Sequence, residues 1–275
     1  MENLKFSGYL LVSDMDATLL NGNSEVSERN QNAIKYFTDN GGKFTVASGR
    51  MVDAVRAYLP YIRINSPAIL HNGAKVYDFD KECVLFERFI EEDRKNALKK
   101  VYENIPGAGL EVYSDEKIYV YRSCSETARL YDKKYDVTYS MPEHIWKEPW
   151  IKALVIAERE ELDGYEKLYR EYDGGNAVRS GDKYLDITAN GVSKGLGVKK
   201  TADILGIRKE NIIVVGDNMN DISMYDEAGI SFAVENAEDE VKKAALYSAP
   251  HYDNDVIEYI VDFIEKKIIA KSGDF

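Results

Sequence analysis

Cysteine and histidine are scarce in this chain, and basic side chains are outnumbered by acidic ones. Two of the 275 residues are cysteine and three are histidine, and 48 acidic side chains against 36 basic ones give a formal net charge of −12. Cys83 and Cys124 make neither a disulfide framework nor the close spacing of a zinc site. The acidic balance argues against a nucleic-acid partner, which would need a basic surface. It leaves an anionic substrate open, because a few local cations or a metal can outweigh a distant surface charge.

Long apolar runs are also missing. No stretch approaches the ~20 apolar residues of a membrane-spanning helix, and residues 1–5 lack the basic start and apolar core of a secretion signal. We therefore expect no membrane partner and a soluble, cytoplasmic protein with reduced thiols. The content of 44% hydrophobic and 31% charged residues is ordinary for a globular protein. The length suffices for two domains or one large one.

Short apolar runs near both ends of the chain alternate with helical patterns. Strands that alternate with helices predict a parallel, doubly wound α/β sheet. Continuous β-branched runs such as 212–215 fit strands that are buried on both faces. The expected strands are 9–12, 44–47, 67–70, 184–187 and 212–215, and the expected helices begin near 27, 51 and 194.

The stretch between these two regions has a different character. Residues 78–183 contain many tyrosines, and the alternation in 117–121 predicts antiparallel strands. Helices near 91–104 and 125–135 would cover one face of them. We interpret this stretch as an α+β domain inserted into the first. The expected boundaries are 1–77 and 184–275 for the parallel-sheet domain and 78–183 for the insert.

Polar side chains follow the expected strands of the parallel sheet. Asp14 and Asp16 come directly after the first, and two carboxylates so close repel each other and raise each other's pKa. A bound cation relieves that repulsion, so the pair indicates a metal-assisted site in which one carboxylate is also a nucleophile. Ligands bind where the carboxyl ends of parallel strands meet. There we expect Asp14, Asp16, Ser48, Arg50, Asn72, Gly73, Asp217, Asn220 and Asp221, with Lys194 entering from a helix start.

This collection of side chains has a coherent chemistry. Carboxylates can hold a divalent cation, while a hydroxyl, a lysine, an amide and backbone N–H groups can hold anionic oxygens. Such a set is typical of phosphoryl transfer, where catalysis is mostly positioning and charge stabilisation.

Four motifs, in order along essentially the whole chain, resemble those of the haloacid dehalogenase-like hydrolases. Within that superfamily the chain is similar to the Cof-type phosphatases, which carry a type IIB cap. The motifs are Asp14-Met15-Asp16-Ala17-Thr18-Leu19-Leu20, Ala47-Ser48-Gly49-Arg50, Ser193-Lys194-Gly195 and Gly216-Asp217-Asn218-Met219-Asn220-Asp221. The triplet Asn72-Gly73-Ala74, which precedes the cap in this group, is also present. The resemblance implies a Rossmann-like doubly wound parallel sheet with an inserted α+β cap.

The resemblance also implies catalytic and metal-binding roles. Asp14 would be the nucleophile that forms an aspartyl-phosphate. Asp16 would be the general acid that protonates the leaving alkoxide and then the base that activates water. Asp14, Asp217 and the backbone carbonyl of Asp16, not its carboxylate, would hold Mg²⁺.

The remaining motif residues would bind the phosphoryl group or support those that do. Ser48 and Lys194 would neutralise the phosphoryl oxygens, and Asp221 would brace Lys194 or the waters of the metal. Arg50 would bind either the substrate or a neighbouring loop, and Asp186 would either help to orient the site or merely end a strand. Further hydrogen bonds to the phosphoryl group would come from Gly49, Asn72, Gly73 and Asn220.

Two positions depart from the family pattern. Alanine stands at position 17 in place of the usual glycine, and its methyl should fit if the loop avoids positive φ there, so we interpret it as a variation within a subgroup. Serine at position 48 replaces the commoner threonine but keeps the hydroxyl.

The implied activity is Mg²⁺-dependent hydrolysis of small organic phosphate monoesters, with the cap closing over the site and choosing the substrate. Sugar phosphates are the first expectation, while nucleotides, pyridoxal phosphate and flavin phosphates stay open. A phosphomutase is one alternative. A non-catalytic sensor of phosphate ligands is another, ranked last because Asp14 and Asp16 are both present. The chain would act as a monomer or a homodimer.

Overall fold

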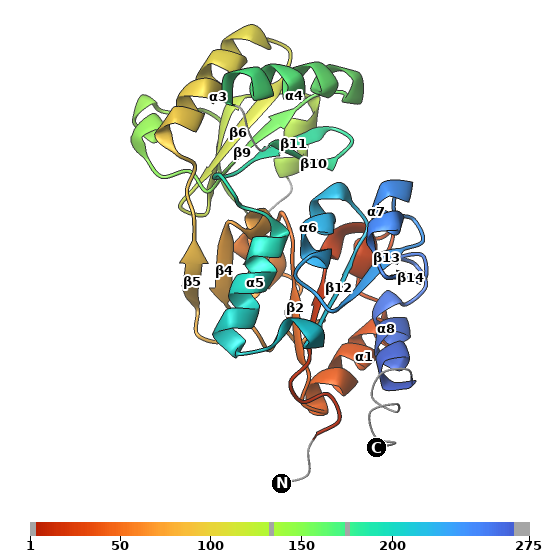
Figure 1. The fold of residues 1–275 in the computed structure, drawn as a ribbon. Helices are drawn as coiled ribbons and strands as arrows, with labels where there is room; N and C mark the ends of the chain where they lie inside the picture. The colour runs from red at the N-terminus through yellow and green to blue at the C-terminus, as the bar shows by residue number, and fades with distance from the viewer. Residues whose placement is uncertain (1–3, 132–134, 174–176, 267–275) are drawn as a thin grey trace.

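The computed structural model describes residues 4–131, 135–173 and 177–266. Two bodies are stacked on each other (Figure 1). The lower body is built on a five-stranded sheet of order β14-β13-β12-β1-β2, in which every neighbouring pair is parallel. This confirms the predicted parallel α/β sheet, drawn from both ends of the chain. Its strands are β1 (Leu10–Ser13), β2 (Lys43–Val46), β12 (Ile212–Gly216), β13 (Ile230–Val234) and β14 (Tyr247–Ala249).

Helices lie on both faces of the parallel sheet (Figure 1). The expected cap at Ser27 is present, since its side chain accepts a hydrogen bond from the backbone N–H of Asn30. That helix, α1, packs against α8, and α5 packs against α6. The helices of this body are α1 (Glu28–Asp39), α2 (Val52–Arg56), α5 (Lys194–Leu205), α6 (Ile222–Tyr225), α7 (Asp239–Ala244) and α8 (Val256–Ile264).

The third expected strand does not join the parallel sheet as a full member. It is β3 (Ala68–Leu70), which pairs antiparallel with β4 (Lys75–Asp78), and β4 pairs antiparallel with β5 (Cys83–Glu87). A single parallel bridge, between Ala47 and Ile69, links this small sheet to the end of β2. Because β5 belongs to this sheet, the lower body continues past the expected boundary at residue 77.

The upper body is the cap, a six-stranded sheet of order β10-β11-β9-β6-β7-β8. Helices α3 (Glu92–Asn104) and α4 (Arg159–Asp173) cover its upper face, and its other face looks toward the parallel sheet (Figure 1). All pairs are antiparallel except β7 with β8. The strands are β6 (Gly109–Ser114), β7 (Lys117–Arg122), β8 (Asp136–Thr138), β9 (Lys152–Ile156), β10 (Ala177–Gly181) and β11 (Tyr184–Ile187).

Two expectations about the cap were wrong. Residues 184–187 were expected in the parallel sheet, but β11 pairs antiparallel with β9 and β10, so the cap extends beyond residue 183. The physical reason is alternation: Leu185 and Ile187 pack into the cap core, while Asp186 points to the other face and lines a cavity. The helix expected at 125–135 is a short 3₁₀ helix at Ser125–Leu130, and residues 132–134 lie outside the described residues.

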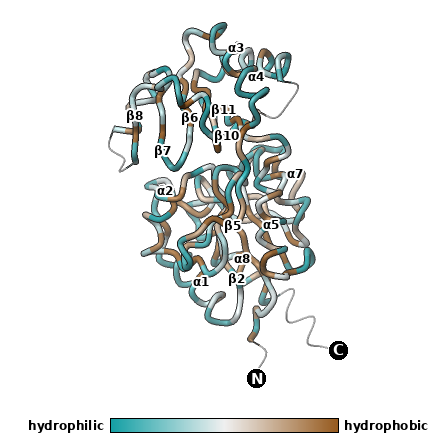
Figure 2. The backbone as a smooth tube through the Cα atoms, turned by 90° about the vertical axis from the view of Figure 1, so that its left-hand side faces the viewer, coloured by the Kyte–Doolittle hydropathy of each residue, from teal (hydrophilic) through white to brown (hydrophobic). Residues whose placement is uncertain are grey.

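Each body has its own apolar core. The colouring in Figure 2 shows hydrophobic residues recurring along the strands of both. One core surrounds the parallel sheet, and a second lies between the cap sheet and its two helices around Trp150. A third apolar cluster joins the bodies, with Met51 and Ala54 of the lower one and Ile118 and Leu154 of the cap. None of the helices in the described residues is long and apolar enough to cross a membrane.

Candidate active site

A cavity of about 530 Å³, called the central cavity below, lies between the carboxyl end of the parallel sheet and the open face of the cap. Most of the site residues predicted from the sequence line it. Gly73 and Asp221 do not, and both lie directly behind it, in contact with residues that do. The nominated residues that line it are Asp14, Asp16, Ser48, Gly49, Arg50, Asn72, Asp186, Lys194, Asp217 and Asn220.

Three carboxylates and one ammonium meet at the bottom of this cavity. Asp14 follows β1 and Asp217 follows the neighbouring β12, and one oxygen of each lies within 4.8 Å of the other and of an oxygen of Asp221. Lys194, the first residue of α5, places its Nζ 2.6 Å from Oδ1 of Asp14 and 2.6 Å from Oδ1 of Asp221. All of these residues are buried except Asp217, which is half-buried. We call Asp14, Asp217 and Asp221 the carboxylate cluster.

Burial dominates the protonation of the carboxylate cluster. It raises the pKa of Asp14 well above the ordinary value, although the Lys194 ammonium opposes this effect. Burial and the charge of Asp221 raise the pKa of Asp217 to about 7. Burial alone would lower the pKa of Lys194, but Asp14 and Asp221 more than offset it, so the pKa is raised and the ammonium stays charged. Excess buried negative charge with oxygen donors fits a hard divalent cation such as Mg²⁺.

Asp221 supports Lys194 from behind. Its second carboxylate oxygen accepts hydrogen bonds from the backbone N–H groups of Asp217 and Asn218, each at 3.0 Å. The carboxylate folds back against Gly216, where a Cβ atom would lie 2.4 Å from Cγ of Asp221. Glycine is therefore required at 216, and of the two roles expected for Asp221 the structure shows the bracing of Lys194.

The polar loops after β2 and β3 interlock beside the cluster. The Ser48 carbonyl accepts a hydrogen bond from the Asn72 backbone N–H at 3.0 Å, and Oδ1 of Asn72 accepts one from Nδ2 of Asn220 at 3.2 Å. Asn72 and Gly73 both have positive φ, +56° and +94°. A Cβ at Gly73 would lie 1.9 Å from the Ser193 carbonyl oxygen, so this loop can pack against the start of α5 only with glycine there.

Arg50 holds Asp16 away from the carboxylate cluster. Its Nε and Nη2 donate to the two oxygens of Asp16 at 3.0 and 2.6 Å, and its guanidinium lies over the ring of Tyr58. Of the two roles expected for Arg50, the structure shows the contact with a neighbouring loop. Both oxygens of Asp16 are occupied, so a proton transfer by this residue requires the pair to open first.

The condition set for Ala17, a loop without positive φ, is not met. Ala17 has φ +54° and ψ 22°, the left-handed region that favours glycine. Its carbonyl accepts a hydrogen bond at 3.0 Å from the side chain of Asn236, which holds the loop in this conformation. The loop therefore keeps the left-handed conformation with alanine in place, and the backbone at this position is strained.

The cap supplies charged residues that the sequence reasoning missed. Lys152 of β9 donates to the Gly49 carbonyl at 3.0 Å and pairs with Asp186 of β11 at 2.9 Å. Asp186 therefore lies inside a cap strand and positions Lys152 against the loop after β2. Arg129 and its partner Glu111 were missed as well. The available signal for Lys152 was a single lysine within the apolar run 151–156.

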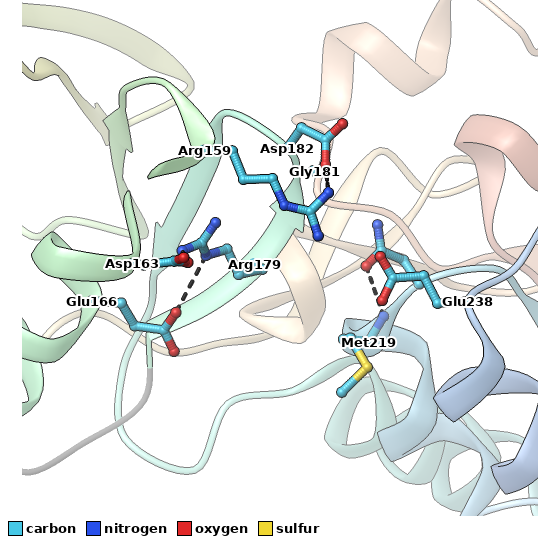
Figure 3. Close-up of a pocket in the computed structure, with 9 residues that line it drawn as sticks. Arg159, Asp163, Glu166, Arg179, Gly181, Asp182, Met219 and Glu238 are labelled. Atoms are coloured by element: carbon cyan, nitrogen blue, oxygen red, sulfur yellow. Dashed lines mark hydrogen bonds and ion pairs between the residues drawn. The ribbon is translucent and has the colours of Figure 1, made fainter. Parts of the chain in front are cut away.

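A second hollow, of about 480 Å³, opens between the bodies beside α4 and β10 (Figure 3). Arg159 pairs with Asp182 at 3.0 Å, and Arg179 pairs with Asp163 and Glu166 at 2.5 and 3.2 Å. Since each arginine is paired with a carboxylate, the described residues that line this outer hollow provide no uncompensated cation for an anionic ligand.

A parallel α/β sheet with an α+β cap over a carboxylate cluster and a buried lysine defines a class of phosphoryl-transfer enzymes. The family model of the haloacid dehalogenase-like hydrolases matches residues 11–261, and the chain belongs to this family. It is a phosphatase of the Cof type.

Relatives and solved structures cover nearly the whole chain. Two relatives of Bacillus subtilis, YwtE and YcsE, are named 5-amino-6-(5-phospho-D-ribitylamino)uracil phosphatases. YwtE is 26% identical to this chain, over 90% of this chain and 95% of its own length. YcsE is 25% identical, over 86% of this chain and 88% of its own length. The structure of TM0651 from Thermotoga maritima is 28% identical with a TM-score of 0.78, covering 92% of this chain and 96% of that one. The subclass IIB sugar phosphatase BT4131 shares the fold, with a TM-score of 0.81, 23% identity and coverage of 93% and 98%.

Proposed function

We propose that the protein hydrolyses small organic phosphate monoesters with the help of Mg²⁺, through a phosphoryl-enzyme intermediate on Asp14. The observation that carries the proposal is the position of Asp14: it is buried below the central cavity and bonded to Lys194. Lys194 offsets the charge of this carboxylate, so an anionic phosphate ester can approach it. Relatives named as phosphatases of a phosphorylated ribitylaminouracil support a phosphate monoester as substrate.

The reaction has two displacements at phosphorus. In the first, an Asp14 oxygen forms a bond to phosphorus while the bond to the alcohol oxygen breaks, and Asp16 gives the leaving alkoxide a proton. In the second, water attacks the phosphorus, its proton passes to Asp16, and the bond to Asp14 breaks to release inorganic phosphate. Because Arg50 occupies both oxygens of Asp16, this cycle requires Asp16 to leave Arg50 and turn toward the cavity.

The other residues hold the phosphoryl group. Lys194 and the hydroxyl of Ser48 contribute positive charge and a hydrogen bond, and the amides of Asn72 and Asn220 lie beside them. Asp14, Asp217 and the Asp16 carbonyl would hold Mg²⁺, which supplies charge stabilisation for the phosphoryl oxygens.

The test is release of inorganic phosphate from a panel of phosphate monoesters by wild type, Asp14→Asn and Asp203→Asn. Asp203 is an exposed residue of α5 outside the cavity and serves as the matched control. We expect Mg²⁺-dependent release that EDTA stops, a loss of about 10³-fold or more in Asp14→Asn, and no change in Asp203→Asn. Acid-quenched wild type should also carry ³²P from a labelled substrate, whereas Asp14→Asn should not.

Two results would contradict the proposal. Undiminished phosphate release by Asp14→Asn would exclude this residue as the nucleophile. An isomerised sugar phosphate in place of inorganic phosphate would favour the phosphomutase alternative.

A further inference from the structure

One hairpin of the cap reaches the lower body beside the polar loops after β2 and β3. Strands β6 and β7 are joined by the two-residue turn Asp115-Glu116, and the hairpin points toward α2 (Figure 2). Both turn residues have positive φ, +50° and +55°. Such turns favour asparagine, aspartate or glycine, so a glutamate at the second position works against the local preference of the backbone. A residue that breaks a local rule in this way is expected where its side chain has a role of its own.

The Glu116 carboxylate joins the cap to three segments of the lower body. Its Oε2 accepts a hydrogen bond at 3.1 Å from the backbone N–H of Val52, the first residue of α2. Its Oε1 accepts one from Nζ of the buried Lys75 in β4, and Nε2 of the buried His71 lies 3.7 Å from the same oxygen. The ring of His71 also packs edge-on against that of Tyr113 in β6, with 6.2 Å between the centroids. The tip of the hairpin is therefore held on the lower body by one carboxylate.

The residues that Glu116 contacts lie directly beside the two polar loops. Val52 closely follows Ser48 in the loop after β2, and His71 immediately precedes Asn72 in the loop after β3. The loops are also bonded to each other, because the His71 N–H donates to the Arg50 carbonyl at 3.1 Å and the Asn72 N–H donates to the Ser48 carbonyl at 3.0 Å. A displacement of Val52 or His71 would therefore also displace the Ser48 hydroxyl and the Asn72 amide.

We infer that Glu116 is a positioning residue, which holds the loops after β2 and β3 in the arrangement that binds the phosphoryl group. It acts through Val52 and Lys75, since it is not among the residues that line the central cavity. The cap thus contributes to the affinity for phosphate itself, in addition to any contact with the alcohol half of a substrate. The inference rests on the proposed function of this cavity and deepens it by adding a residue of the cap to the phosphoryl site.

Charge and positioning predict opposite effects of Glu116 on phosphate binding. Burial alone would raise its pKa, but the nearby His71 and Lys75 lower it to about 2, so the carboxylate is ionised near neutral pH. A negative charge in the vicinity of an anionic ligand weakens the binding of that ligand. Removal of the charge should therefore strengthen phosphate binding, whereas loss of the positioning contacts should weaken it.

The test uses inorganic phosphate as a competitive inhibitor, because this ligand has no alcohol half to contact the cap. Wild type and Glu116→Gln are compared in Mg²⁺ with para-nitrophenyl phosphate as the substrate. Glutamine carries one acceptor and one donor on its amide, so it cannot replace both oxygens that accept from Val52 and Lys75. We expect the Ki of inorganic phosphate and KM to rise together by about tenfold, the scale of one hydrogen bond to a charged group, with kcat within about threefold of wild type.

Two matched variants serve as controls. Glu87→Gln also removes a carboxylate near Lys75, at 3.7 Å, but Glu87 belongs to β5 of the lower body. Asp115→Asn changes the exposed neighbour in the same turn, where asparagine tolerates positive φ. Both should leave Ki within about twofold of wild type. A lower Tm of Glu116→Gln with an unchanged Ki would show a structural role alone and overturn the inference, and so would an equal rise of Ki in Glu87→Gln.

A measurement on wild type keeps the inference independent of how the variant folds. Coupling between two sites is reciprocal, so bound phosphate must stabilise the contact that helps to bind it. Hydrogen exchange of the Val52 N–H reports the opening of its bond to Glu116. Saturating inorganic phosphate with Mg²⁺ should slow this exchange about tenfold relative to Mg²⁺ alone. Exchange of the Asp80 N–H, which donates to the Asp78 carboxylate at the other end of β4, should not change.

The outcomes separate this inference from the proposed function. Unchanged exchange at Val52 in protein saturated with inorganic phosphate would overturn the inference and leave the proposed phosphatase standing. If wild type neither hydrolyses the ester nor binds inorganic phosphate, the proposed function fails, and the inference fails with it.

Discussion

Ala17 holds a backbone conformation that costs an L-residue free energy. With φ at +54° it lies in the left-handed region, which is about 1–2 kcal/mol unfavourable for a residue with a Cβ atom. Glycine would remove this strain, but it would also add about 0.5–1 kcal/mol of conformational entropy to the unfolded chain. We therefore expect Ala17→Gly to raise the free energy of unfolding by about 0.5–1 kcal/mol. For a chain of this size that corresponds to a Tm increase of about 1–4 °C.

The assay is thermal unfolding followed by circular dichroism, with Ala244→Gly as the control. Ala244 is exposed and ends the right-handed helix α7, so glycine there leaves no cavity and lowers stability by about 0.5–1 kcal/mol. The same chemical change should thus shift Tm in opposite directions at the two positions. If Ala17→Gly lowers Tm as Ala244→Gly does, the positive φ at position 17 is not a source of strain and the reasoning is refuted.

Three further predictions concern the carboxylate cluster and the cap. Gly216→Ala should displace Asp221, because its Cγ would lie 2.4 Å from the new methyl. We expect the equilibrium constant for folding and kcat each to fall by at least about tenfold. Gly164→Ala is the control, since a Cβ there has nothing within 4 Å, and it should lower neither quantity. Burial raises the pKa of Asp217 to about 7, so the cation-free protein should lose stability as pH rises from about 4 to 7. Saturating Mg²⁺ should remove this loss. The measurement is Tm against pH in EDTA and in Mg²⁺, and two matching profiles would contradict the prediction. Burial alone would raise the pKa of Glu116, but the nearby His71 and Lys75, of which Lys75 donates a hydrogen bond to it, lower it from 4.5 to about 2. Its ionised form thus stabilises the fold above pH 4.5, and denaturant titrations of Glu116→Gln should show about 1–3 kcal/mol less loss of stability between pH 5 and 2 than wild type.

The bottom of the central cavity was predictable because its residues depend on one simple rule. Asp14 and Asp217 each follow a strand whose side chains are all buried, and such strands lie side by side in a parallel sheet. Once both strands are assigned, the sheet edge brings the carboxylates together without any knowledge of side-chain packing. Lys194 follows for a related reason, since Ser193 is a strong N-cap that fixes the start of α5.

The cap could not be predicted in the same way, because its contacts depend on partners far along the chain. Strand β11 joins β9, and nothing in residues 184–187 names that partner. An isolated glutamate in a strand is usually exposed, but Glu111 is fully buried because Arg129 reaches it from the 3₁₀ helix at Ser125–Leu130 and Tyr113 donates to it from the same strand. The pair of Arg50 and Asp16 is likewise set by the fold, with 34 positions between the two residues.

The two halves of the central cavity treat charge in opposite ways, and this difference divides the work of recognition. At the carboxylate cluster, three carboxylates share one ammonium, so an excess of negative charge is left that a bound cation can offset. Above it, Arg129 and Lys152 are each balanced by a carboxylate before any ligand arrives. Under the proposed function, affinity for the phosphoryl end would therefore be electrostatic and common to all phosphate esters. We therefore expect discrimination between alcohols to come from shape and directed hydrogen bonds, because these two cations of the cap, among the described residues that line the cavity, already have carboxylate partners.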